Sequence, residues 1–165
     1  MIEVSRARTS DVDGIRQLVD PQAGKRVLLA KETVSYYENL PEFRVCRNEA
    51  GEVVGCGALH VMWKDLAEVR TLTVREDQKG TGMGSAILRQ LLEDAREIGV
   101  ARVFCLTFET AFFGRHGFEP IDGIPVEPQV YAELLRSYDE GVAEFLDLER
   151  VKPNTLGNTR MLKVL

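Results

Sequence analysis

Three glycines in five residues, Gly80, Gly82 and Gly84, are the feature that most constrains the fold of this chain. The segment before them, 67–74, alternates as a strand does, and apolar residues recur at helical spacing over 87–95. The glycines therefore lie in a turn from a strand into a helix. The first N–H groups of a helix have no acceptor within it, and the helix dipole is positive there, so the turn is predicted to bind an anion such as a phosphate.

Other uses of such a turn can be weighed from the sequence. A nucleotide P-loop is excluded because no Lys-Ser or Lys-Thr pair follows the glycines. A dinucleotide-binding turn is matched in part by Gly80, Gly82 and Ser85, with Glu109 after the next strand as a ribose-binding acid, and it is the main alternative. The layout opposes it, because too little sequence follows for the strand–helix units of a doubly wound sheet. A tight turn without a ligand would normally need only one glycine.

Strand and helix patterns alternate along the rest of the chain. Strand patterns are found at 2–8, 42–48, 53–63, 67–74, 101–106 and 160–165. Helical patterns are found at 9–20, 31–40, 87–99, 109–117 and 130–146. The segments 42–48 and 53–63 flank a short polar turn and predict an antiparallel hairpin. The order predicts an α+β fold, a mixed and mostly antiparallel sheet flanked by helices, in a single domain over 1–165.

The composition of the chain limits the kinds of partner that it is expected to bind. With 165 residues, a net charge of −5 and scattered basic residues, the chain is predicted to bind a small molecule and no nucleic acid. Cys46, Cys56 and Cys105 lie in apolar strand patterns without metal-ligand spacing, which predicts reduced core thiols in a cytoplasmic protein. His60 and His116 also lack metal-ligand spacing, so no metal is expected. No leader and no apolar stretch long enough to cross a membrane is found in the sequence.

The segment VREDQKGTGMGS resembles the pyrophosphate-binding loop of the GNAT superfamily of N-acetyltransferases, and AFFGRHGFEP is similar to a segment near the end of that fold. The order of elements along the whole chain is also similar. The resemblance implies the acyl-CoA N-acetyltransferase fold with acetyl-CoA as co-substrate. Lys79 stands where the family usually has Arg or Gln, but the backbone N–H groups of roughly 79–84 are expected to bind the phosphates. The implied cofactor-binding residues are Leu72, Val74, Lys79, Gly80, Thr81, Gly82, Met83, Gly84 and Phe113.

Three segments, CGALHVMWKDLAEVRTLTV, LTFETAFFGRHGF and NTRMLKVL, resemble N-acetylglutamate synthases more narrowly. This resemblance implies acetyl transfer from acetyl-CoA to the α-amino group of L-glutamate or L-glutamine, the first step of arginine biosynthesis. The amino-acid-kinase domain that many such synthases carry is absent from the sequence, so it is similar to a short, stand-alone type. Alternatives are an N-acetyltransferase for another small amine and a non-catalytic acyl-CoA sensor. A homodimer is compatible with this fold.

An α-amino group is mostly protonated near neutral pH, so it must lose a proton before it attacks a thioester. Glu68, on the strand before the glycine turn, is the candidate base, as the family resemblance also implies. Alternation places Glu68, Arg70, Leu72 and Val74 on one face if no bulge interrupts the strand. The alternative for Glu68 is a surface pair with Arg70. The Leu72 N–H is the expected donor to the oxyanion.

The departing thiolate gains from a proton donor. Many members of the superfamily use a Tyr at the position of Phe113, which has no such proton. Thr110 aligns roughly with a hydroxyl residue proposed for this role in the synthases, and the alternative is that it caps a helix.

The substrate's carboxylate is expected to bind basic side chains. The resemblance implies Lys31 and Arg160 for this role, and Arg70 is predicted to face the same side as Glu68. For each of the three, the alternative is a solvated surface charge.

Overall fold

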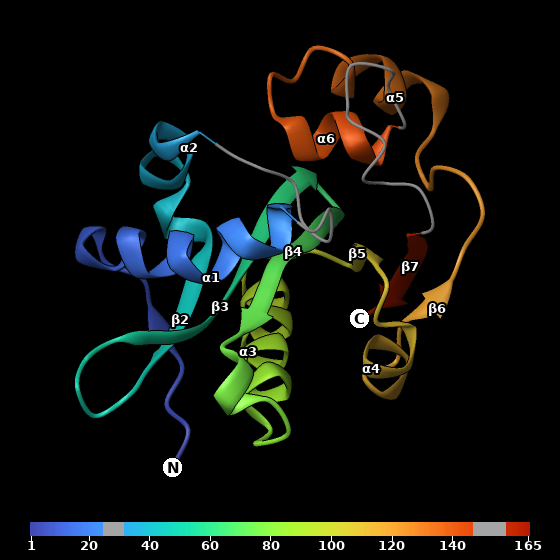
Figure 1. Cartoon of the computed structure of the whole chain (residues 1–165). Coiled ribbons are helices and arrows are strands. Elements are labelled where there is room, and N and C mark those ends of the chain that lie inside the picture. The colour runs from blue at the N-terminus through green and yellow to red at the C-terminus, as the bar shows by residue number, and fades with distance from the viewer. Residues whose placement is uncertain (25–31, 147–157) are drawn as a thin grey trace.

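A computed structural model describes residues 1–24, 32–146 and 158–165 of the chain. Its strands form one seven-stranded sheet in the order β1-β2-β3-β4-β5-β7-β6 (Figure 1). Among the described strands β4 and β5 are the one parallel pair and the other neighbours pair antiparallel, so the predicted mixed and mostly antiparallel sheet is confirmed. The strands are β1 (Ser5–Arg6), β2 (Phe43–Arg47), β3 (Val53–Trp63), β4 (Leu66–Val74), β5 (Arg102–Thr107), β6 (Glu119–Pro120) and β7 (Thr159–Val164).

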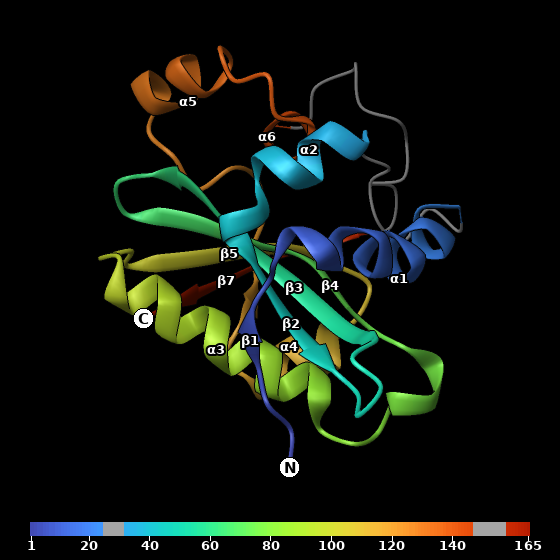
Figure 2. The ribbon, with the colours of Figure 1, turned by 90° about the vertical axis from the view of Figure 1, so that its left-hand side faces the viewer.

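Helices cover both faces of the sheet. The α-helices are α1 (Val12–Gly24), α2 (Thr33–Glu38), α3 (Met83–Glu97), α4 (Thr110–Arg115), α5 (Pro128–Leu134) and α6 (Glu140–Phe145). The α3 helix and Phe113 of α4 share one buried cluster with β3, β4 and β5. On the other face, α1 and α2 pack against β2 and β3, and α5 and α6 pack against Leu66 and Phe104. Figure 2 shows α3 along one side of the sheet and α1 and α2 along the other.

Two predicted elements differ from the structure. The strand pattern at 2–8 forms a strand only at Ser5–Arg6. The helical pattern at 130–146 is divided into α5 and α6 by a turn. In that turn the Asp139 carboxylate accepts a hydrogen bond from the Val142 N–H at 2.9 Å and caps α6, so a new helix begins there.

The long helix α3 approaches β3 closely because β3 carries glycines under it. A Cβ atom on Gly57 would lie 3.0 Å from Ile87 Cγ2 and 3.1 Å from Leu91 Cδ1. A larger residue would push the helix away from the sheet. The Arg44 guanidinium, from β2, adds two hydrogen bonds to the Asp94 carboxylate at 2.8 and 2.7 Å. The start of α3, which holds the glycine turn, is thus fixed relative to the strands.

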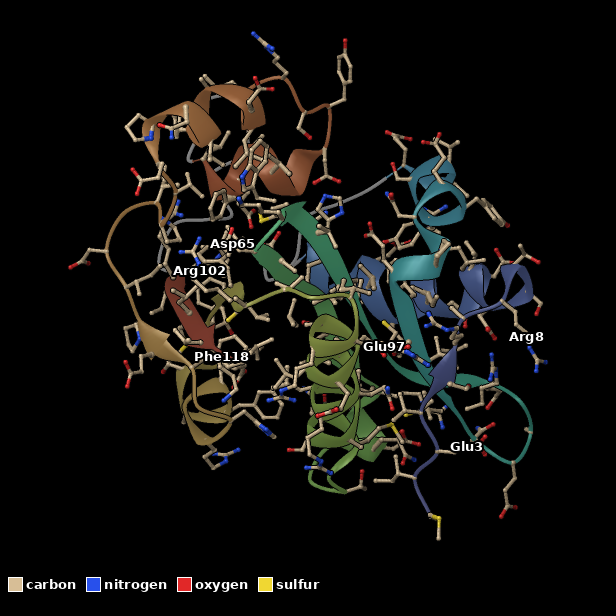
Figure 3. The ribbon with its side chains drawn as sticks, turned by 180° about the vertical axis from the view of Figure 1, so that it is seen from behind. Glu3, Arg8, Asp65, Glu97, Arg102 and Phe118 are labelled. Atoms are coloured by element: carbon tan, nitrogen blue, oxygen red, sulfur yellow. The ribbon has the colours of Figure 1, made fainter. Side chains whose placement is uncertain are left out.

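The parallel strands β4 and β5 are paired at one end only. Their bridge pairs run from Leu66↔Arg102 to Glu68↔Phe104 among the residues described. An ion pair between Asp65 and Arg102, at 3.2 Å, closes the paired end, and Figure 3 shows these two side chains next to one another. The two strands have separate neighbours beyond Glu68, which leaves the middle of the sheet open toward the glycine turn.

A bulge in β4 overturns the predicted alternation. The register with β3 shifts between Cys56 and Ala58, and Thr71 opposite this shift has a positive φ of 59°. Leu72 and Val74 therefore pack in the cluster under α3. The expectation that Glu68, Arg70, Leu72 and Val74 share one face is wrong, because the extra residue moves the last two to the opposite face.

The cysteines Cys46, Cys56 and Cys105 are buried thiols outside any disulfide in the part of the chain that the structure describes, as predicted for core thiols. Burial raises the pKa of Cys46 to about 11 and also raises that of Cys105. Across 1–24, 32–146 and 158–165, no helix is both long and apolar enough to cross a membrane.

Candidate active site

The glycine turn connects β4 to α3 with its backbone donors exposed. Gly80 has a φ of 81° and Gly82, the N-cap of α3, has a φ of 89°, a conformation that favours glycine. The first hydrogen bond of the helix runs from the Ala86 N–H to the Gly82 carbonyl at 3.0 Å. The N–H groups of Met83, Gly84 and Ser85 thus precede the helical ladder, and no backbone acceptor for them is found in the described chain. They form a cradle of free donors.

The third glycine is not required by the chain itself. A Cβ atom on Gly84 would lie 3.6 Å from Phe112 Cζ, an ordinary contact, and Gly84 does not have a positive φ. A side chain at this position would instead stand over the free N–H groups of the first turn. The sequence predicts an anion that approaches the backbone closely here, and a glycine permits such an approach.

The polar side chains of the turn have partners within the turn. Lys79 Nζ lies 2.9 Å from the Glu76 carboxylate, and the Thr81 hydroxyl donates to the Gln78 carbonyl at 2.6 Å. Since Lys79 and Thr81 are both exposed, the strongest donors that the turn offers inward are its backbone N–H groups.

Glu68 and Arg70 form the central polar group of the site. The Arg70 Nη2 and Nε donate to Glu68 Oε1 at 2.8 and 3.1 Å, and the Glu68 residue is 3% exposed. The surface pair considered from the sequence is therefore a buried pair on an interior strand. Both hydrogen bonds from Arg70 go to Oε1, and Oε2 has no hydrogen bond within the described residues, which leaves one carboxylate oxygen for a further partner.

Asp139 completes this group from a distant part of the chain. Its carboxylate oxygens accept from Arg70 Nη1 at 2.9 and 3.1 Å. Burial is the largest single effect and opposes charge on Asp139, but Arg70, His60 and the hydrogen bond from the Val142 N–H together hold the pKa of this carboxyl below its ordinary value. For Arg70, burial acts against the charged form, and the carboxylates of Glu68 and Asp139 raise its pKa all the same.

The guanidinium of Arg70 lies directly on α6. A Cβ atom on Gly141 would come within 2.5 Å of Arg70 Cζ, so only glycine fits there with Arg70 in its present place. Arg160, on β7, lies at the other end of α6, where its Nη1 donates to the Phe145 carbonyl at 2.8 Å. Its guanidinium carbon also lies 5.8 Å from the centre of the Phe104 ring. Both predicted anchors thus hold α6, one at each end.

The predicted Phe113 and Thr110 occupy different settings. Phe113 is buried, with Phe112 and Phe118 packed edge-on against its ring at 5.2 Å. Thr110 is exposed at the start of α4. The hydroxyl that binds the start of this helix belongs to Thr107, which accepts from the Glu109 N–H at 2.8 Å. Helix capping by Thr110, the alternative considered from the sequence, is therefore not what the structure shows.

Sequence reasoning missed Asp139 and Gly141, and one predicted residue lies elsewhere. Asp139 follows Ser137 and precedes a helical run, a pattern typical of a helix N-cap that could have been recognised. No sequence signal pairs it with Arg70, which is 69 positions away. Lys31 lies outside the described residues.

Two alternatives can be tested against this geometry. A dinucleotide-binding fold requires a doubly wound parallel sheet, whereas β4 and β5 are the one parallel pair among the bridged strands described. That alternative is therefore wrong. A search of the described residues for three or more His, Cys, Asp or Glu side chains that could hold a metal ion finds no such group.

Comparisons with known proteins agree with the fold and with the turn. Residues 13–118 match the model of the acetyltransferase (GNAT) family. An amino-acid acetyltransferase of Mycobacterium tuberculosis is 58% identical over 164 residues, 98% of this chain and 94% of that protein. An amino-acid acetyltransferase of Ralstonia nicotianae is 33% identical over 72% of this chain, which corresponds to 27% of that longer protein.

Solved structures extend the comparison. A Mycobacterium tuberculosis protein crystallised with CoA and the ligand NLQ has a TM-score of 0.95 and 57% identity, with 99% of each chain covered. An N-acetylglutamate synthase from Neisseria gonorrhoeae, crystallised with coenzyme A and N-acetyl-glutamate, has a TM-score of 0.78 at 20% identity. The chain covers 35% of that synthase, and this likeness is one of fold.

Proposed function

The chain belongs to the acetyltransferase (GNAT) family, and we propose that it transfers the acetyl group of acetyl-CoA to the α-amino group of a small amino acid, L-glutamate or L-glutamine. This reaction would be the first step of arginine biosynthesis. The observation that carries the proposal is the cradle of free N–H groups at the start of α3. The strand that leads into it, β4, holds the buried carboxylate of Glu68. The name of the Mycobacterium tuberculosis relative supports an amino acid as acceptor.

The turn binds the pyrophosphate of acetyl-CoA in this proposal. Met83, Gly84 and Ser85 supply the N–H donors, and the glycines let the phosphates come close to the backbone. The pantetheine arm then runs along the opening between β4 and β5, which are unpaired beyond Glu68. The CoA found in the Mycobacterium tuberculosis structure supports this binding mode, because that protein covers 99% of the chain at a TM-score of 0.95.

Glu68 is the proposed base. Arg70 holds Oε1 in place, so Oε2 can accept a proton from the substrate ammonium, directly or through one water. The free amine then attacks the thioester carbonyl and forms a carbon–nitrogen bond. Collapse of the tetrahedral intermediate breaks the carbon–sulfur bond and releases the CoA thiolate.

Two further groups serve the intermediate in this mechanism. The Leu72 N–H, next to the bulge at Thr71, is the proposed donor to the oxyanion, since a bulge interrupts regular ladder bonding. The exposed hydroxyl of Thr110 is the proposed donor of a proton to the thiolate, and through solvent it takes up in exchange the second proton, which the attacking nitrogen loses as the amide forms. Phe113 is proposed to contact the pantetheine arm through the edge of its aromatic cluster.

Which arginine can bind the substrate carboxylate depends on the N–H groups that each has not already used within the protein. Arg70 uses Nε, Nη1 and Nη2 on the chain's own carboxylates, so its proposed role becomes the positioning of Glu68. Arg160 donates to carbonyls and retains further N–H groups, which makes it the proposed carboxylate anchor. Lys31 is proposed as a second anchor on the family resemblance alone.

The test is thiol release from acetyl-CoA, followed with each of the twenty amino acids in turn. Glutamate or glutamine should give the highest kcat/KM, and product mass should rise by one acetyl group. If CoA raises the melting temperature and no amino acid yields thiol, the chain binds acyl-CoA without transferring it and the proposed transfer is wrong.

The role of Glu68 is tested by Glu68→Gln, which keeps the hydrogen-bond acceptor and removes the base. We expect kcat/KM to fall roughly 100-fold or more at unchanged affinity for acetyl-CoA. Glu93→Gln, an exposed change on α3, is the control for the lost charge. An unchanged kcat/KM in Glu68→Gln excludes Glu68 as the base.

A further inference from the structure

Basic side chains without a counter-charge gather beside the glycine turn. Arg89 on α3, Arg115 at the end of α4 and Lys163 on β7 have no carboxylate within ion-pair distance in the part of the chain that the structure describes. Arg44 and Arg102, by contrast, are both paired with aspartates. What distinguishes Arg89, Arg115 and Lys163 is that all three act on one histidine, in a chain whose net charge is −5.

These cations surround one histidine. His116 Nε2 lies 3.0 Å from the Ser85 hydroxyl, and its ring lies 5.1 Å from that of Phe112. Burial lowers the pKa of His116, and the positive charges of Arg89, Arg115 and Lys163 lower it further. The charges are thus near enough to act on the same group from α3, α4 and β7.

The cluster adjoins the proposed phosphate cradle. Ser85 supplies one of the free N–H groups of the first turn of α3, and its side chain contacts His116. Arg89 lies one turn further along the same helix. Phe112 lies against Gly84, which brings the α4 helix alongside the start of α3. Free N–H donors and unpaired cations therefore lie near one another at this end of α3.

Like charges held together destabilise a fold unless an anion neutralises them. CoA carries two anionic groups, a pyrophosphate and a phosphomonoester at the 3′ position of the adjacent ribose. The N–H groups of the first turn suit the pyrophosphate, and a second group of cations one turn away suits the phosphomonoester, which carries nearly two charges near neutral pH.

We propose that Arg89, Arg115 and Lys163 bind the 3′-phosphate of CoA and so make the protein select CoA over 3′-dephospho-CoA. This inference rests on the proposed function, since it takes CoA to lie across the glycine turn. His116 and Ser85 join the two phosphate sites and orient them relative to each other.

The test compares the binding of CoA and 3′-dephospho-CoA by isothermal titration calorimetry. The wild-type protein should bind CoA roughly 10- to 100-fold more tightly, and lower salt should widen the difference. In the double variant Arg89→Ala with Arg115→Ala the ratio should fall to about one to threefold, with the affinity for 3′-dephospho-CoA nearly unchanged. Both side chains are exposed, so the fold should be retained.

The matched control is Arg96→Ala. Arg96 is also exposed on α3, but it is paired with Glu93 at 2.6 Å near the other end of the helix. Arg96→Ala removes one positive charge, as each change in the double variant does. It should leave the ratio of CoA affinity to 3′-dephospho-CoA affinity as in the wild type. The ratio of the affinity for CoA to that for 3′-dephospho-CoA is compared between the variants. If Arg96→Ala lowers this ratio as much as each arginine of the double variant does, the effect is one of general charge and the inference is overturned.

A second readout follows His116 itself by NMR titration of its ring protons. CoA should raise the pKa of His116, because a neighbouring phosphate dianion favours the imidazolium, whereas 3′-dephospho-CoA should raise it much less. Equal binding of the two ligands by the wild-type protein overturns the inference and leaves the proposed function standing. If neither ligand binds, the proposed use of the glycine turn is wrong as well.

Discussion

Gly141→Ala is the change that tests the packing of α6 on the active site most directly. The new methyl group would come within 2.5 Å of Arg70 Cζ and 2.8 Å of Nη1, which is closer than such atoms approach in proteins. A flexible surface arginine could move away at little cost. Arg70 cannot, because its side chain is 8% exposed and is bonded to both Glu68 and Asp139.

The magnitude follows from two opposed effects. Alanine in place of glycine inside a helix stabilises it by at most about 1 kcal/mol. Disruption of a buried ion pair costs about 3–5 kcal/mol when a charge is left without its partner. The net expectation is a loss of about 2–4 kcal/mol in the free energy of unfolding. For a chain of this size that loss corresponds to a fall of roughly 5–15 °C in Tm.

The assay is thermal and denaturant unfolding of Gly141→Ala beside Gly114→Ala. Gly114 is also helical, in α4, but a Cβ atom there would meet no heavy atom within 4 Å. Gly114→Ala should therefore be neutral or slightly stabilising. Gly141→Ala should also lose activity, since displacement of Arg70 releases Glu68. A Gly141→Ala protein as stable as Gly114→Ala would refute the close packing of Arg70 on α6.

Three further predictions address the cradle, the pH dependence and the thiols. Gly84→Ala should weaken CoA binding about tenfold at unchanged Tm, because the added methyl group fits beside Phe112 but covers the free N–H groups; calorimetry and thermal unfolding would show this. Asp139 has a lowered pKa in the folded state, so its stabilising effect is present above its unfolded pKa and is lost as the pH falls through the folded value. The gap in unfolding free energy between the wild type and Asp139→Asn should therefore be constant above about pH 5 and shrink below about pH 4. Cys46, Cys56 and Cys105 should react with a thiol reagent only after unfolding, because all are buried and the pKa of Cys46 is raised to about 11.

Local patterns in the sequence were enough to predict the elements that hold the site. The glycine turn lies between a strand and a helix, and the hairpin of β2 and β3 forms where a polar turn separates two apolar runs. Both signals depend on neighbouring residues: glycine permits a positive φ at Gly82, and alternation marks a strand. The family resemblance added the acyl-CoA N-acetyltransferase fold, which no local pattern encodes.

The bulge in β4 could not be predicted in this way. Thr71 is a β-branched residue with a positive φ, and such residues normally avoid that conformation. Its backbone is held there by the pairing of β3 with β4 on either side of the shift, which is a property of the assembled sheet. One such residue reverses the face of every residue after it, so Leu72 and Val74 face α3 while Glu68 faces α6.

The partners of the charged residues in the site could not be predicted from local sequence either. The family resemblance marks Arg160 as a candidate anchor and strand alternation marks Arg70, and both bind oxygen atoms in the structure, at opposite ends of α6. Which oxygen atoms they bind depends on where the chain returns, and Asp139 lies 69 positions after Arg70. A helix that packs over β4 and β5 places its own carboxylate on Arg70 and its own carbonyls on Arg160. Because Arg70 has little donor capacity left and Arg160 has more, the same fold that fixes Glu68 also decides which arginine can still bind a substrate carboxylate.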